Sequence, residues 1–149
     1  MAETLLAALR AALGENAVAV GAEVPERNRN DWSPLPPVTP LAVIRPSTPE
    51  GVATAMGLAF RHGVPVVPQG GLTGLAGGAR PVANGLALSL ERLTGIEEID
   101  PDAATVTVRA GTTLEAVQTA AAAAGFMVAI DLGARGSCSI GGNLSTNAG

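Results

Sequence analysis

A loop dense in glycine follows directly after an apolar run, and its residue types indicate that it binds a ligand. After Val66-Val67 the chain reads Pro68-Gln69-Gly70-Gly71-Leu72-Thr73-Gly74-Leu75-Ala76-Gly77-Gly78. Glycine has no Cβ and tolerates positive φ, so successive backbone N–H groups in such a loop can converge on one anion. The pattern therefore predicts that the loop holds a phosphate or pyrophosphate group.

Two common phosphate-binding motifs do not fit this loop. The Gly-x-Gly-x-x-Gly register of doubly wound dinucleotide-binding folds cannot be read through it. A Walker A loop requires a lysine, and the chain contains none. The loop therefore predicts a different phosphate-binding architecture.

A second glycine-rich stretch lies near the end of the sequence. Residues 130–149 hold glycines, small hydroxyl side chains and two asparagines, with little that could build a core. Such residues favour a tight backbone path that offers many hydrogen bonds to a polar ligand. Two stretches of this kind predict one extended ligand gripped from two sides.

Composition narrows the possible partners. The 149 residues are 47% hydrophobic, enough for one core or for one domain of two small lobes. The net charge is −4 and the nine basic residues, all arginine, are scattered, which argues against nucleic acid as a partner. No apolar run approaches the ~20 residues of a membrane span, and no signal-peptide pattern is seen, so the cytoplasm is the expected location. A single cysteine and a single histidine disfavour a disulfide or a metal site.

The first elements must bring the glycine loop to a sheet edge. Residues 3–13 carry leucines at helical spacing, and residues 24–40, with five prolines, predict an ordered surface loop. A strand over 41–45, a helix capped near Thr48 and a strand over 64–67 form a βαβ unit with parallel strands. The helix is expected to bury Val52, Met56, Ala59 and Phe60 and to end at His62-Gly63. The glycine loop then leaves the carboxyl end of a strand, where open α/β sheets bind ligands.

The pattern changes after residue 95. Residues 86–90 predict a further strand, 96–100 and 105–109 an antiparallel hairpin, and 114–124 a helix capped by Gly111-Thr112-Thr113 and ended by Gly125. The expected organisation is an N-terminal helix and proline-rich loop (1–40), a first lobe (41–95) and the start of a second lobe (96–149).

Four segments in this order resemble the FAD-binding domain (PCMH type) of the vanillyl-alcohol oxidase type flavoproteins. They are Pro68 to Leu75, Leu90-Glu91-Arg92-Leu93, Ala110-Gly111-Thr112-Thr113-Leu114 and Asp131 to Gly149. Within that family the resemblance is closest to the D-lactate, glycolate and D-2-hydroxyglutarate dehydrogenases, and Gln69 with the run 131–138 favours the last. The resemblance implies an α+β fold in which a small parallel βαβ lobe precedes an incomplete antiparallel-sheet lobe with helices.

The resemblance also implies noncovalent FAD, with its pyrophosphate on residues 70 to 75. The implied cofactor-binding residues are Pro68, Gln69, Gly70, Gly71, Leu72, Thr73, Gly74, Leu75, Gly78, Asp131, Ser137, Ile140, Gly141, Gly142, Asn143, Thr146 and Asn147. Leu72 replaces the glycine or asparagine usual there, and a positive φ would cost it of order 1 kcal/mol. Cys138 lies near a region where distant relatives attach flavin, but a buried thiol is the commoner role.

The implied reaction is oxidation of a D-2-hydroxy acid, with hydride passing from the substrate carbon to flavin N5. No catalytic base can be assigned, because the chain has no tyrosine and one histidine. The sequence stops inside a motif that the substrate domain follows in relatives, so we expect a truncated chain whose bare second lobe promotes homo-oligomers. Alternatives are an inert fragment that folds without retaining flavin, and the related reductase of cell-wall precursor synthesis.

Three side chains have two interpretations each. His62 suits the negative end of a helix dipole better than a general base. Trp32 is expected to pack its loop against the surface rather than to touch a substrate. For Arg135, contact with a pyrophosphate or a substrate carboxylate and a solvated surface role are equally favoured.

Overall fold

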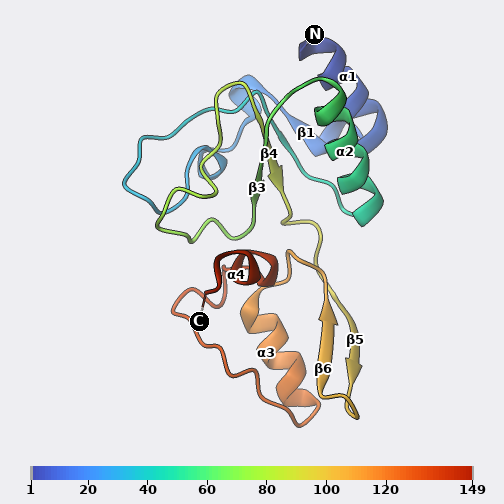
Figure 1. The fold of residues 1–149 in the computed structure, drawn as a ribbon, viewed down its shortest axis with the longest axis vertical. Coiled ribbons are helices and arrows are strands. Elements are labelled where there is room, and N and C mark those ends of the chain that lie inside the picture. Colours follow the sequence, from blue (N-terminus) through green and yellow to red (C-terminus); the bar gives the residue numbers. More distant parts are fainter. Residues whose placement is uncertain (1, 149) are drawn as a thin grey trace.

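The computed structural model describes residues 2–148, which form two parts stacked along the long axis of the molecule (Figure 1). The helices are α1 (Ala2–Leu13), α2 (Pro49–Arg61), α3 (Leu114–Ala123) and α4 (Ile140–Thr146). The strands are β1 (Val18–Ala19), β2 (Ala42–Ile44), β3 (Val66–Gln69), β4 (Leu86–Ser89), β5 (Ile96–Asp100) and β6 (Thr105–Val108).

The first part is built on a four-stranded sheet in the order β1-β2-β4-β3. Strands β2, β4 and β3 are parallel, as the βαβ pattern predicts, and β4 lies between the other two. Strand β1 pairs antiparallel with β2, through Val18 opposite Ile44. The sequence did not predict β1, because two residues are too few to show a period of two.

Helices α1 and α2 cover one face of this sheet (Figure 1). Leu5 and Leu9 of α1 are fully buried there. Helix α2 begins as predicted: the Thr48 hydroxyl accepts a hydrogen bond from Gly51 N at 3.1 Å. It ends at His62, the C-cap residue, and Gly63 follows with φ of 64°. The structural interpretation of His62 therefore agrees with its position.

The predicted buried face of α2 is wrong in part. The helix buries Ala55, Leu58 and Ala59, whereas Phe60 is 87% exposed and Met56 44% exposed. Each exposed residue lies one position after a buried alanine, and one position turns the side chain by about 100° around the helix. Small side chains at the contact let α2 approach the sheet and α1 closely, so the larger apolar residues are left outside.

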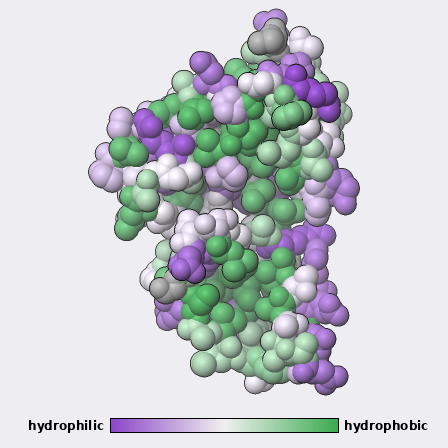
Figure 2. Space-filling model, in the orientation of Figure 1, coloured by the Kyte–Doolittle hydropathy of each residue, from purple (hydrophilic) through white to green (hydrophobic). Residues whose placement is uncertain are grey.

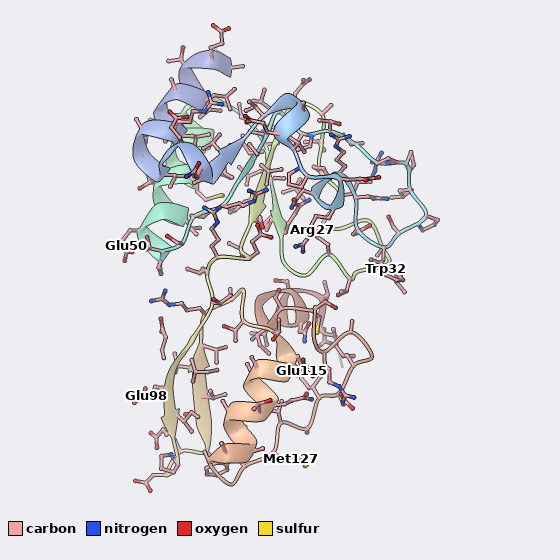
Figure 3. The ribbon with its side chains drawn as sticks, turned by 180° about the vertical axis from the view of Figure 1, so that it is seen from behind. Arg27, Trp32, Glu50, Glu98, Glu115 and Met127 are labelled. Carbon is pink, nitrogen blue, oxygen red and sulfur yellow. The ribbon has the colours of Figure 1, made fainter. Side chains whose placement is uncertain are left out.

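The other face of the sheet is covered by the segment that follows β1. Val24 packs there with Ala19, Val43 and Ala87. The segment is irregular, as predicted, apart from short 3-10 turns such as Glu26–Arg29. The expectation that Trp32 packs on the surface is wrong, because its side chain is 76% exposed at the outer edge of the loop (Figure 3).

The second part contains the β5–β6 hairpin, helix α3 and the unexpected helix α4. The hairpin is antiparallel, with a register shift between Ile96 and Glu98. Helix α3 is capped by the Thr113 hydroxyl, as predicted. Helix α4 lies inside the second glycine-rich stretch, capped by Ser139. Two adjacent glycines, each costing about 1 kcal/mol against alanine in a helix, hid this helix from sequence reasoning.

Asp31 connects the N-terminal segment to the glycine loop. Its carboxylate accepts hydrogen bonds from the backbone N–H of Ser33 at 3.0 Å and of Ala79 at 3.4 Å. Burial raises the pKa of the Asp31 carboxyl, but hydrogen bonding from Ser33 and from Ala79 lowers it more, so the pKa lies below its usual value. The ionised form is therefore the one that fits this structure.

Replacing Asp31 by asparagine is expected to lower the free energy of unfolding at neutral pH by about 1 kcal/mol. Because the folded pKa is depressed, this contribution is complete above the unfolded pKa of about 3.9 and is lost as the pH falls through the folded value. Urea denaturation between neutral pH and about pH 3 measures both effects. The exposed Asp102→Asn variant is the control. Equal stability of Asp31→Asn and wild type at every pH would contradict this account.

Candidate functional site

A cleft of about 310 Å³ lies where the two parts of the molecule meet. Figure 2 shows the outline narrowing there, with pale, near-neutral residues gathered at the junction. The cleft is lined by Arg27, Gly70, Gly71, Glu91, Thr94, Gly111, Thr113, Gly136, Ser137 and Ser139. Both glycine-rich stretches of the sequence contribute to it, as we expected of segments that grip one ligand.

The first glycine loop touches the second glycine-rich stretch backbone to backbone. A Cβ on Gly71 would collide with the Ser137 carbonyl oxygen and lie 2.7 Å from Cys138 Cα. A Cβ on Gly70 would collide with the Ser139 hydroxyl. Neither glycine has positive φ. Glycine is needed at these two positions for close approach, and not for the left-handed conformation that the sequence also allowed.

The second glycine-rich stretch is held by a run of backbone hydrogen bonds to residues 110–114. Leu114 N donates to Cys138 O at 3.3 Å, Ile140 N to Thr112 O at 2.9 Å, and Gly141 N to Ala110 O at 2.8 Å. Gly111 N in turn donates to Leu93 O at 2.8 Å. Backbone hydrogen bonds therefore join three of the four motifs that carried the family resemblance, those at residues 90–93, 110–114 and 131–149.

The side chain of Gln69 supports the loop and does not face the cleft. It is fully buried, and its Oε1 accepts from Asn28 Nδ2 at 2.8 Å. Its Nε2 donates to Asn28 O at 3.0 Å and to Ala79 O at 2.9 Å. Since the amide is fully engaged, Gln69 can meet a cofactor only through its backbone.

Of the other predicted site residues, only Ser137 also lines the cleft, and Gly142 lies beside Gly70, its Cα 3.9 Å from the position of a Cβ there. Those outside the lining are Pro68, Gln69, Leu72, Thr73, Gly74, Leu75, Gly78, Asp131, Ile140, Gly141, Asn143, Thr146 and Asn147. Leu72 has a positive φ of 61° and is 8% exposed, so it carries the backbone strain that the sequence analysis expected for a leucine with positive φ.

Several predicted residues are engaged elsewhere. Asp131 pairs with Arg135 at 2.8 Å on the surface, which favours the solvated role for this arginine. The amide of Asn143 is buried and lies 3.6 Å from the Cys138 sulfur. Cys138 is itself 3% exposed, as expected of a buried thiol. Thr146 and Asn147 are exposed.

Sequence reasoning missed the charged residues of the cleft. Arg27 Nη1 lies 3.2 Å from Glu91 Oε2, and Arg45 Nε lies 2.9 Å from Glu91 Oε1. Glu91 falls in one of the quoted motifs, which was a usable signal. Arg27 stands in an irregular loop without periodicity, so no signal in the sequence could have placed it.

The cleft has the lining of a site for a polar ligand. Its volume lies at the lower end of the range of small-molecule sites, roughly 300–1,000 Å³. Its walls offer glycine backbone, the hydroxyls of Thr94, Thr113, Ser137 and Ser139, the guanidinium of Arg27 and the carboxylate of Glu91. Among residues 2–148, no helix is long and apolar enough to cross a membrane, and no three His, Cys, Asp or Glu side chains gather as a metal ion requires.

Comparisons with known proteins agree with this site. A family model described as FAD binding domain matches residues 40–149. A D-2-hydroxyglutarate dehydrogenase of Xanthomonas citri pv. viticola is 45% identical over 124 residues, covering 83% of this chain and 26% of that protein. A mitochondrial D-2-hydroxyglutarate dehydrogenase of Danio rerio is 38% identical over 119 residues, 80% of this chain and 22% of that protein. The chain thus spans about a quarter of these curated relatives.

Solved structures show the same fold. An alkyldihydroxyacetonephosphate synthase matches with a TM-score of 0.87 at 17% identity, over 97% of this chain and 31% of that one. The α+β fold of vanillyl-alcohol oxidase type flavoproteins, expected from the motifs, is confirmed. The chain belongs to the family of FAD binding domains, and its cofactor is FAD.

Proposed function

We propose that this chain is the FAD-binding part of a flavin-dependent dehydrogenase of D-2-hydroxy acids, and that the cleft between its two parts holds FAD noncovalently. The observation that carries the proposal is the close contact of Gly70 and Gly71 with residues 137–139, which brings the backbones of both glycine-rich stretches to the cleft. The FAD binding domain match over residues 40–149 supports the same ligand.

The residues of the chain bind and orient the cofactor. The backbone N–H groups of residues 70–75 face the diphosphate in our proposal, as donors that need no side chain. The Ser137 and Ser139 hydroxyls hold polar groups of the cofactor on the opposite wall. When bound, FAD supplies the acceptor for the two electrons of the oxidation.

D-2-hydroxyglutarate is the first candidate substrate, with D-lactate and glycolate next. The support is identity to proteins named D-2-hydroxyglutarate dehydrogenase, of 45% and 38%. We assign no catalytic base to this chain, because Glu91, the one carboxylate that lines the cleft among the described residues, is paired with two arginines. Substrate contacts are proposed to come from a further domain.

The alternative is a domain that folds but retains no flavin on its own. The observation that favours it is that Leu75, Thr146 and Asn147, all predicted to hold the cofactor, are exposed and lie outside the cleft. A cofactor with fewer partners binds more weakly. Flavin retention therefore decides between the two proposals.

We propose that the chain divides after residues 40 and 95 into an N-terminal segment and two lobes. We also propose the cytoplasm as its compartment, although the Danio rerio relative is named as mitochondrial.

We propose that the chain forms homo-oligomers. Large apolar side chains on the surface support this, among them Phe60 and Met127, 87% and 85% exposed. Light scattering that gave the mass of a single chain would count against it.

The purified chain is expected to bind one FAD per chain and to show flavin absorbance near about 450 nm after gel filtration. Because the bond is noncovalent, acid precipitation should leave all the flavin in the supernatant. Titration of FAD fluorescence gives the affinity. Flavin that stays with the acid pellet would contradict noncovalent binding, and absence of binding would establish the alternative.

Gly71→Ala is expected to weaken FAD binding by at least about tenfold, because the added Cβ must push the backbone of Ser137 and Cys138 away. Gly133→Ala, in the second glycine-rich stretch, is the matched control, because Gly133 is not among the predicted cofactor-binding residues. A Cβ there meets nothing within 4 Å and the backbone needs no positive φ. FAD fluorescence titration of both variants tests the prediction, and equal affinities would refute it.

The longer protein that contains this domain is expected to reduce a dye acceptor with D-2-hydroxyglutarate faster than with D-lactate or glycolate. This chain alone should show no turnover, since residues 2–148 offer no carboxylate or histidine in the cleft besides the paired Glu91. Initial rates with each substrate are the measurement. Turnover by the isolated chain would show that the catalytic residues have been misplaced.

A further inference from the structure

We propose that Arg27 is a diphosphate-binding side chain of the cleft, and that Glu91 is the internal anion that occupies it when no ligand is bound. This rests on the proposed function for the identity of the ligand. Arg27 lies before residues 40–149, the part that matches the FAD binding domain. The proposal therefore gives the N-terminal segment a role in binding the cofactor.

Arg27 faces the junction between the two parts of the molecule (Figure 3). It lines the same cleft as Gly70, Gly71 and Ser137. Its side chain is 56% exposed, so water and ligands can reach the guanidinium. Its contact with Glu91 uses Nη1, and a guanidinium carries five N–H donors, so several remain for a second anion.

The backbone that carries Arg27 is firmly held. Its neighbour Asn28 is 1% exposed and hydrogen-bonded to the buried Gln69. Arg29 Nη2 also donates to Val24 O at 3.2 Å. The side chain of Arg27 can therefore turn between partners while its Cα stays in place, which keeps the entropy cost of binding small.

The charges around the cleft favour an exchange of partners. Glu91 meets Arg45 as well as Arg27, and Arg45 is the more buried of the two, at 16% against 56% side-chain exposure. If Arg27 moved to a ligand, Arg45 would still neutralise Glu91. Among the described residues that line the cleft, Arg27 is the only cation and Glu91 the only anion.

A guanidinium binds a diphosphate more strongly than the neutral N–H groups of a glycine backbone do. Guanidinium binds phosphate oxygens in a bidentate manner, and such charge-assisted bonds are roughly twice as strong as neutral ones. The Glu91 carboxylate on the same wall repels the diphosphate and competes for Arg27. Removing Arg27 should therefore weaken diphosphate binding, whereas removing the charge of Glu91 should strengthen it.

The first test titrates the chain with inorganic pyrophosphate and with ADP while NMR follows the Nε–H resonances of its nine arginines. The Arg27 signal, assigned by its loss in Arg27→Lys, is expected to shift and saturate. The Arg10 signal should not move, because Arg10 pairs with Glu15 and belongs to α1, a helix that lies away from the junction (Figure 1). An Arg27 signal unmoved by both ligands overturns the proposal. An Arg27 signal that shifts with D-2-hydroxyglutarate but not with pyrophosphate also overturns the proposal, because Arg27 would then bind a carboxylate.

The second test measures the affinity of variants for FAD and for pyrophosphate. Arg27→Ala should weaken both by about tenfold or more, with Arg27→Lys in between, and the control Arg10→Ala should change neither. Glu91→Gln keeps an acceptor for Arg27 but removes the charge, so binding should tighten roughly two- to fivefold. Weaker binding in Glu91→Gln would overturn its role as a competing anion.

The outcomes separate this proposal from the proposed function. FAD binding that is equal in wild type and Arg27→Ala overturns the role of Arg27 and leaves the function standing. Pyrophosphate binding through Arg27 without any FAD binding overturns the proposed function and leaves the role of Arg27 standing. If the chain binds neither ligand, both proposals fall.

Discussion

The backbone contact between Gly71 and residues 137–138 fixes the geometry on which the cleft depends. With no Cβ at Gly71, the end of the parallel sheet and the second glycine-rich stretch approach to a separation that no other residue allows. Gly111 repeats this arrangement against the Leu90 carbonyl. Two such contacts set the distance between the parts, and hydroxyl and backbone groups then line what is left open.

Buried polar bonds hold the glycine loop that makes this contact. Gln69 and Asn28 are at most 1% exposed and hydrogen-bond to each other, and Gln69 also donates to Ala79 O further along the loop. A buried amide that loses its partner costs about 1–3 kcal/mol, so these bonds oppose any other loop path. The N-terminal segment thus acts as a support for the loop as well as a cover for one sheet face.

The sequence predicted those features that follow from local chemistry. Helix caps at Thr48 and Thr113, the hairpin and both glycine-rich stretches were found because turn and cap residues leave a signal within a few positions. The buried face of α2, the solvated Trp32 and the place of Arg27 were not, because long-range packing decides them. Counting glycines also cannot tell which need space and which need positive φ.

Leu72 shows how tertiary packing overrides such a local rule. Its left-handed backbone costs about 1–2 kcal/mol, and a glycine there would avoid that cost. Yet Leu72 is only 8% exposed, and burying a leucine side chain contributes about 1.5–3 kcal/mol. Burial therefore offsets the strain, so a leucine can occupy a position where a local rule asks for glycine. The strained residue sits directly after Gly70 and Gly71, where it also limits the freedom of the loop that must keep its backbone open toward the cleft.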